Sequence, residues 1–271
     1  MIYHPLIRNL QWICRNVVVM ERRCLKSFNI KLANRVICIK PMHEYIREYC
    51  KDYITDEVAE FMISIEDNDI SYEREKSKCD DIKAGISIRV FKDEYLELLA
   101  VYRKIVEKLI EHNIVLFHGS AVSVDGQGYL FVAPSGTGKS THTRLWRESF
   151  GERVVMINDD KPLISVSEVG VIIHGTPWRG KHNLGINMSV PLKAICILER
   201  SKENHIEKIT NERVFGLILQ HVYRPRGVVA MIKTMEILDS LVEDIELYRL
   251  GCNKEPEAAR VAFEGMNGGL S

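Results

Sequence analysis

Residues 133–141 combine glycine, lysine and hydroxyl side chains in one short run, APSGTGKST. This spacing is typical of a loop that holds a nucleotide's phosphates. Gly136 and Gly138 free backbone N–H groups that can converge on the β- and γ-phosphates, and the following helix adds the partial positive charge of its N-terminus. Lys139 would neutralise the phosphates, and Ser140 would bind the Mg²⁺ that bridges them. The predicted nucleotide-binding residues are Pro134, Ser135, Gly136, Thr137, Gly138, Lys139, Ser140 and Thr141.

The surroundings of this loop agree with the motif. The apolar run 129–132 predicts a strand before it, and residues 141–150 predict a helix after it. One position departs, since Ala133 stands where the pattern G-x-x-x-x-G-K-[ST] has its first glycine. Alanine disfavours positive φ, so the entry turn must use an ordinary backbone conformation or carry strain. The alternative, a glycine-rich turn that happens to precede a lysine, is disfavoured by the strand and helix on either side.

Two carboxylates follow the next predicted strand. The apolar run 154–157 is followed by Asn158, Asp159 and Asp160, and the carboxyl end of a strand is where a nucleotide is expected. Neighbouring residues on a strand point to opposite sides, so the two aspartates should do different jobs. Without the phosphate loop, such a pair is as often an N-cap and turn; with the loop, a metal and base role is favoured.

The stretch 175–192 is long for a connector and rich in Gly, Pro and Asn. Within it, Trp178, Arg179, Lys181 and Asn183 offer an aromatic surface with hydrogen-bond donors, which could clamp an acceptor substrate. An ordered surface loop explains the same composition, and the sequence does not decide between the two.

The predicted elements divide the chain into parts. Residues 1–26 form a basic leader without a clean period, either a contact arm or a poorly ordered segment, and we favour the second. Residues 27–113 contain short strands and end in an amphipathic helix over 93–112, which predicts a small α+β module. From 114 the strands become closely spaced, so 114–271 is predicted to be one domain around the phosphate loop.

Composition narrows the classes of partner. Lysine and arginine together number 37, as do aspartate and glutamate, so the net charge gives no reason to expect nucleic acid or an anionic membrane. The seven cysteines are scattered and include no C-x-x-C pair, which predicts a reduced, cytoplasmic protein. No apolar run approaches the length of a transmembrane helix. The oligomeric state is not fixed by the sequence, and a homo-oligomer stays open.

Three linked features resemble the catalytic domain of HPr kinase/phosphorylase: His118-Gly119 on the hairpin before the loop, the loop itself, and Asp159-Asp160 after the next strand. More distantly, the segment is similar to the nucleotide-binding half of phosphoenolpyruvate carboxykinases. The resemblance covers residues 114–160. It implies an α/β fold, with a mixed-sheet P-loop domain of this type joined to the small α+β N-terminal module, and it implies ATP and Mg²⁺ as cofactors.

The resemblance also assigns roles to residues of this chain. His118 belongs to the catalytic centre, where a lone histidine would more often be a satisfied buried one. Lys139 contacts the phosphates, Ser140 and Asp159 hold the metal, and Asp160 accepts the proton, although the order of the two aspartates stays open.

Two positions depart from the family pattern. Thr141 stands where the family has an acidic residue, and the segment 178–180 lacks the acid of a Glu-Arg-Gly-type signature. Both departures speak against the reverse, phosphorolytic reaction and against the protein HPr as substrate. The expected function is therefore an ATP-dependent kinase that transfers the γ-phosphate to a hydroxyl, in a protein, a peptide or a small molecule.

Two alternatives remain beside the kinase. A nucleotide-binding regulatory or peptide-recruiting module needs Lys139 and Ser140 but no base, so His118, Asp159 and Asp160 discriminate it from an enzyme. Carboxykinase chemistry requires a separate dicarboxylate and metal site, which cannot be assembled from this sequence.

Overall fold

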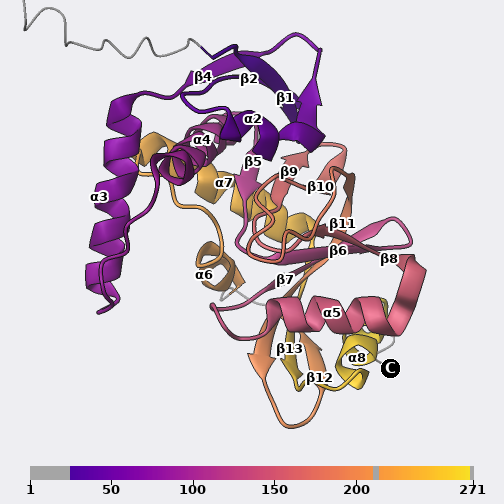
Figure 1. Ribbon diagram of the computed structural model, residues 1–271. Coiled ribbons are helices and arrows are strands. Elements are labelled where there is room, and N and C mark those ends of the chain that lie inside the picture. Colours follow the sequence, from indigo (N-terminus) through magenta and orange to yellow (C-terminus); the bar gives the residue numbers. More distant parts are fainter. Residues whose placement is uncertain (1–24, 210–213, 269–271) are drawn as a thin grey trace, which may run out of the picture.

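Figure 1 shows the computed structural model of the chain, which describes residues 25–209 and 214–268. The predicted basic leader, 1–26, lies outside the described residues apart from its last two. The first sheet has the strand order β3-β1-β2-β4. Its β1–β2 turn passes through Ala33 and Asn34, both at positive φ, as a tight hairpin requires. Its strands are β1 (Phe28–Leu32), β2 (Arg35–Lys40), β3 (Ile54–Thr55) and β4 (Phe61–Ser64).

Helices cover this small sheet and extend beside it (Figure 1). The predicted helix over 93–112 is observed as α4 (Asp93–Ile110), and its buried apolar residues pack into the core of the sheet. The other helical elements of this part are α2 (Tyr45–Tyr49), η1 (Lys51–Tyr53) and α3 (Asp67–Lys83).

The second sheet is mixed and has nine strands among the described residues, with the main order β5-β9-β10-β11-β7-β6-β8 and with β13 and β12 branching from β11. The branch arises because residues 189–191 of β11 pair with β10, whereas residues 194–200 pair with β13. The strands are β5 (Ile114–Leu116), β6 (Ser120–Val124), β7 (Gln127–Val132), β8 (Val154–Asn158), β9 (Leu163–Ser167), β10 (Gly170–His174), β11 (Ser189–Arg200), β12 (His205–Lys208) and β13 (Glu246–Cys252).

The directions of β6, β7 and β8 bring the segments of His118, the phosphate loop and the aspartate pair to the same end of these strands. Both β7 and β8 run antiparallel to β6. The carboxyl ends of β7 and β8 therefore lie at the same edge as the amino end of β6.

Helices pack on both faces of the second sheet, and each face has its own core (Figure 1). On one face lie α6 (Val214–Leu219) and α7 (Val228–Asp244), whose Ile237, Leu238 and Leu241 are buried. On the other face α5 (Lys139–Phe150) packs beside α8 (Glu257–Met266), with Trp146 as its largest buried side chain; η2 (Gly151–Arg153) follows α5. The chain thus has an α/β fold built on a curled mixed sheet.

The two sheets share a core. Ile114 and Leu116 of β5, Leu163 of β9 and Trp178 are buried in the same cluster as the apolar residues of the small sheet and α4. The small sheet is therefore packed against the second sheet by apolar side chains and not merely tethered to it.

Several predicted bounds change in the structure. The long loop ends at residue 188, because β11 begins at Ser189 and not near 194 as expected. The short strand β12 was not predicted. The helix expected over 211–222 is observed as α6 (Val214–Leu219), with residues 211–213 outside the described part. No helix in the described ranges has both the length and the apolar character needed to cross a membrane.

Candidate functional site

The candidate site lies where β6 begins and β7 and β8 end. Gly119 lets the chain pass close to β7 just before β6, since an added Cβ would lie 2.6 Å from Leu130 Cδ1 and 2.9 Å from the carbonyl oxygen of Phe131. The Gly119 N–H donates to the carbonyl oxygen of Asp160 at 3.0 Å. The sheet thereby holds the segment of His118 directly beside the segment of Asp160.

The predicted phosphate loop joins β7 to α5 with its glycines in left-handed conformations. Gly136 has φ 79° and Gly138 has φ 124°, values that L side chains rarely adopt. Ala133 is not among the positive-φ residues, so the entry turn uses an ordinary backbone conformation. No side chain caps the N-terminus of α5, which leaves its first-turn N–H groups available to an anion.

Lys139 is half-buried in this loop. Its Nζ donates to the carbonyl oxygen of Ala133 at 2.9 Å. Burial lowers the pKa of the Lys139 ammonium, while the nearby charges of Asp160 and Asp159 act in the opposite direction. The lysine thus lies within electrostatic reach of both predicted carboxylates.

Asp159 is held by a short hydroxyl relay. Its side chain accepts a hydrogen bond from Ser120 Oγ at 2.7 Å, and Ser120 Oγ lies 3.1 Å from Thr143 Oγ1 of α5. The aspartate is only 7% exposed. This relay ties the carboxylate to the helix that begins at the phosphate loop. No group of three or more His, Cys, Asp or Glu side chains suited to a metal ion occurs in the described part of the chain.

Asp160 lies near the side chains of His118 and Lys161, and its charge acts on Lys139. Its Oδ1 lies 3.6 Å from His118 Nε2, too far for a hydrogen bond, and its Oδ2 accepts from Lys161 Nζ at 2.5 Å. Burial lowers the pKa of His118, and Lys139 lowers it further, against the opposing effect of Asp160. The histidine is therefore expected to be neutral at pH 7, and a small movement would bring it into hydrogen-bond contact with the carboxylate.

Asn158 shapes the turn that presents both aspartates. Its Oδ1 accepts from the backbone N–H groups of Asp160 at 2.9 Å and Lys161 at 2.6 Å. Its Nδ2 donates to the carbonyl oxygen of Thr176 at 3.1 Å and to Thr176 Oγ1 at 3.0 Å. One buried side chain thus connects the aspartate turn to the long loop.

The predicted substrate loop lies against Asp160, but its members differ in position. An added Cβ on Gly180 would lie 2.9 Å from the Cβ of Asp160. Trp178 is buried with its ring centroid 5.1 Å from that of Tyr102, and Arg179 Nη2 donates to Asp52 Oδ2 at 2.8 Å. The loop is therefore anchored on the small sheet's side of the molecule.

The two remaining members of the predicted loop are exposed. Lys181 lines a cavity together with Asp160, whereas Asn183 occupies a left-handed turn with φ 49°. The structure thus brings Trp178 and Lys181 to one cavity with the aspartate, and it uses Arg179 as an ion-pair anchor.

A cavity of about 450 Å³ adjoins the phosphate loop on the side of β11 and β13. Arg200 Nη2 donates to the carbonyl oxygen of Gly136 at 2.7 Å, which fixes the glycine turn from this side. The residues that line this cavity include Gly136, Thr137, Gly138, Thr141, Leu198 and Asn253. This cavity offers room for a nucleoside next to the loop.

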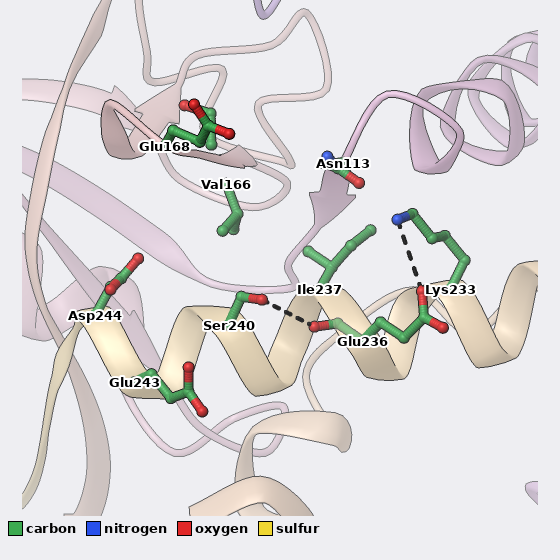
Figure 2. A pocket seen from close by; sticks show the side chains of 10 residues that line it. Asn113, Val166, Glu168, Lys233, Glu236, Ile237, Ser240, Glu243 and Asp244 are labelled. Atoms are coloured by element: carbon green, nitrogen blue, oxygen red, sulfur yellow. Dashed lines mark hydrogen bonds and ion pairs between the residues drawn. The ribbon is translucent and has the colours of Figure 1, made fainter.

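A further cavity, of about 510 Å³, lies apart from these residues. Figure 2 shows Lys233, Glu236, Ser240 and Asp244 of α7 facing Glu168 of the β9–β10 turn across it. None of the predicted site residues lines it.

Sequence reasoning missed residues that support the site rather than form the motif. Asn158 and Lys161 flank the aspartate pair directly, and an Asn at a strand end followed by a turn is a recognisable signal for an Asx turn. Arg200 and Tyr102 are distant from the loop in sequence, and no spacing rule connects them to it.

Comparisons with known proteins give distant likenesses. The profile of a family described as SynChlorMet cassette protein ScmC matches residues 87–221. No curated protein matches the chain. A similar solved structure is the Hpr(Ser) kinase/phosphatase from Coxiella burnetii, with 11% identity and a TM-score of 0.33, over 57% of this chain and 96% of that one. At this level of likeness, function has to be argued from the geometry of the site.

Proposed function

We propose that this chain is an ATP-dependent kinase of the HPr kinase type, which transfers the γ-phosphate to a hydroxyl in a protein, a peptide or a small molecule. The observation that carries the proposal is the position of Asp160. This carboxylate lies 3.6 Å from His118 Nε2. Its negative charge also raises the pKa of Lys139, which belongs to the phosphate loop. A module that only binds nucleotide needs the loop but has no use for a carboxylate at that position.

The residues around the loop fit a magnesium nucleotide. The uncapped N-terminus of α5, the left-handed glycines and the half-buried Lys139 provide donors and positive charge for phosphate oxygens. Ser140, in the first turn of α5, and Asp159 supply the oxygen donors that Mg²⁺ prefers. When bound, the metal would neutralise charge on the phosphates. Arg200 and the cavity beside Gly136 would receive the nucleoside.

In this mechanism Asp160 takes the proton of the acceptor hydroxyl. The acceptor oxygen forms its bond to the γ-phosphorus while the bond from that phosphorus to the β–γ bridging oxygen breaks, so that ADP leaves. His118, neutral and 3.6 Å from the carboxylate, orients Asp160, and Lys139 neutralises the charge on the phosphates. Asp159, held by Ser120, would hold the metal with Ser140.

The test is transfer of label from γ-labelled MgATP. Purified protein is incubated with an extract of its own cell, and the labelled molecule is identified. The Lys139→Ala variant should transfer no label, because the phosphates lose their neutralising charge. Equal transfer by this variant under saturating MgATP would overturn the proposal. Nucleotide binding without any transfer by the wild-type protein would instead favour the regulatory module.

A further inference from the structure

A cavity of about 430 Å³ has Asp160 in its wall and aromatic side chains around it. The aromatic residues come from both parts of the chain: α2 and α4 supply the tyrosines, and the long loop supplies the tryptophan. They are Tyr45, Tyr49, Tyr95, Tyr102 and Trp178. Burial raises the pKa of Tyr49 to about 12, so its hydroxyl stays a neutral donor. This volume is at the lower end of the range for small-molecule sites, roughly 300–1,000 Å³.

The two oxygens of Asp160 connect this cavity to the phosphate loop. Oδ1 is the atom near His118, whereas Oδ2 pairs with Lys161. The Lys161 ammonium in turn lies 5.7 Å from the ring centroid of Tyr102, in the cavity wall. A hydroxyl group placed in the cavity therefore has access to the same carboxylate that faces the phosphate-binding side.

One cation of the cavity wall has no partner in the part of the chain that the structure describes, and the buried ring of Trp178 lies behind it. Lys181 is exposed and forms no ion pair with any described residue. With Lys161 paired to Asp160, the charge left over in the wall is the positive charge of Lys181. An anionic group on a ligand would be stabilised there.

We propose that this aromatic cavity binds the phosphoryl acceptor, and that the acceptor carries its hydroxyl beside an aromatic ring and a carboxylate. This inference rests on the proposed kinase function and names its substrate class. Rings that pack edge-on or offset against tyrosine and tryptophan gain more than their buried area gives, roughly 3- to 10-fold in affinity for a good pair. The ring can belong to a free small molecule or to a residue of a peptide.

Binding to the full chain tests the proposal without any need for turnover. The probe is 4-(hydroxymethyl)benzoate, and its matched aliphatic control is 4-(hydroxymethyl)cyclohexanecarboxylate, which keeps the hydroxyl and the charge but lacks the ring's π-system. A short peptide, acetyl-Ser-Phe-Glu-amide, forms the second arm. Titration calorimetry should show at least about 3-fold tighter binding of the aromatic probe than of the aliphatic one. Whether the small molecule or the peptide binds more tightly tells which source the acceptor has.

Variants in the wall locate the binding. Tyr45 and Tyr95 are 45% and 42% exposed, so Tyr45→Leu and Tyr95→Leu should leave the fold intact. Each should reduce the preference for the aromatic probe. Lys181→Gln should weaken the binding of both carboxylate probes at least about 3-fold. Tyr72→Leu and Lys83→Gln on α3 are the matched controls, because neither residue lines the cavity. Both control variants should bind the two probes as tightly as the wild-type protein does.

The outcomes separate this inference from the kinase proposal. Equal binding of the two probes, or binding that all three wall variants leave unchanged, overturns the aromatic acceptor site. If wall variants act as expected but wild-type protein transfers no label from MgATP, the kinase proposal fails and the role of the cavity as an acceptor site fails with it. Label transfer together with equal binding of both probes would leave the kinase and overturn only the substrate class.

Discussion

A Cβ atom on Gly180 would lie 2.9 Å from the Cβ of Asp160, so the backbone of the long loop is packed directly against the proposed base. The loop thus limits where this carboxylate can lie. Gly180 also has φ 66°, a conformation that favours glycine.

We therefore expect Gly180→Ala to displace Asp160 or the loop. A misplacement of about 1 Å in a reacting group can cost roughly 10²-fold in rate, so turnover should fall by about 10-fold or more while ATP affinity stays within a few-fold. Gly85→Ala is the matched control, because Gly85 has the same φ of 66° but no atom within 4 Å of an added Cβ. If both variants lose only stability, the contact with Asp160 does not matter for catalysis.

The aspartate pair separates catalysis from binding. Asp160→Asn keeps the volume but cannot take a proton, so turnover should fall by roughly 10²–10⁴ with ATP affinity within a few-fold of wild type. Asp159→Asn should instead raise the Mg²⁺ concentration needed for half-maximal activity. Asp239→Asn, at an exposed position on α7, serves as control. Turnover and ATP binding of each variant are measured on the same preparation. Normal turnover of both Asp159→Asn and Asp160→Asn would assign the aspartates a structural role.

Asn158→Ala should lower stability and activity together. The substitution removes four side-chain hydrogen bonds, two from the backbone N–H groups of Asp160 and Lys161 and two to Thr176. At about 0.5–1.5 kcal/mol for each bond, the free energy of unfolding should fall by about 2–6 kcal/mol. Asn204→Ala, whose side chain also accepts from a backbone N–H, at 3.0 Å, should lower stability without a specific loss of turnover. Thermal unfolding and label transfer distinguish the two variants, and a stable, fully active Asn158→Ala would contradict this account.

Two buried histidines should make stability fall in acid. Burial lowers the pKa of His174 to about 4 and that of His142 to about 3, whereas an unfolded chain has a value near 6.5. The unfolded state therefore binds protons that the folded state does not, so stability is complete above pH 6.5 and is lost as pH falls towards 4.

The expected size of this effect is ~1.4 kcal/mol per pH unit for each histidine. His174→Gln keeps polar contacts to Ser165 and Ser189 within reach but cannot titrate. Urea unfolding between pH 6.5 and 4.5 should therefore show a shallower loss for the variant, and the two curves should run parallel between pH 7 and 8. Equal slopes in the acid range would mean that His174 does not contribute.

The sequence predicts the segments that make up the site better than it predicts what surrounds them. The loop and the strand before Asp159 each follow from local patterns, because turn residues and strand periodicity act over a few positions. Strand alternation was expected to separate the two aspartates, but β8 ends at Asn158, so this rule does not reach them; their different partners, Ser120 and Lys161, come from the turn that follows.

Local sequence patterns do not predict which distant elements pair with one another. The branching of β11 depends on β10 and β13, which lie on either side of it in sequence. The role of Arg179 depends on Asp52, 127 positions away. Nor does the motif predict that Lys139 is half-buried and donates a hydrogen bond to Ala133, because only the folded loop brings this carbonyl oxygen to the ammonium.

We expect the apolar cluster shared by the two sheets to make them one cooperative unit. Ile114, Leu116, Leu163 and Trp178 would all lose apolar neighbours if the first 113 residues were removed. A chain that starts at 114 would then expose a large apolar surface and should aggregate rather than fold. Heating the intact protein should accordingly give a single calorimetric transition, with equal calorimetric and van't Hoff enthalpies, even though the ribbon suggests two lobes.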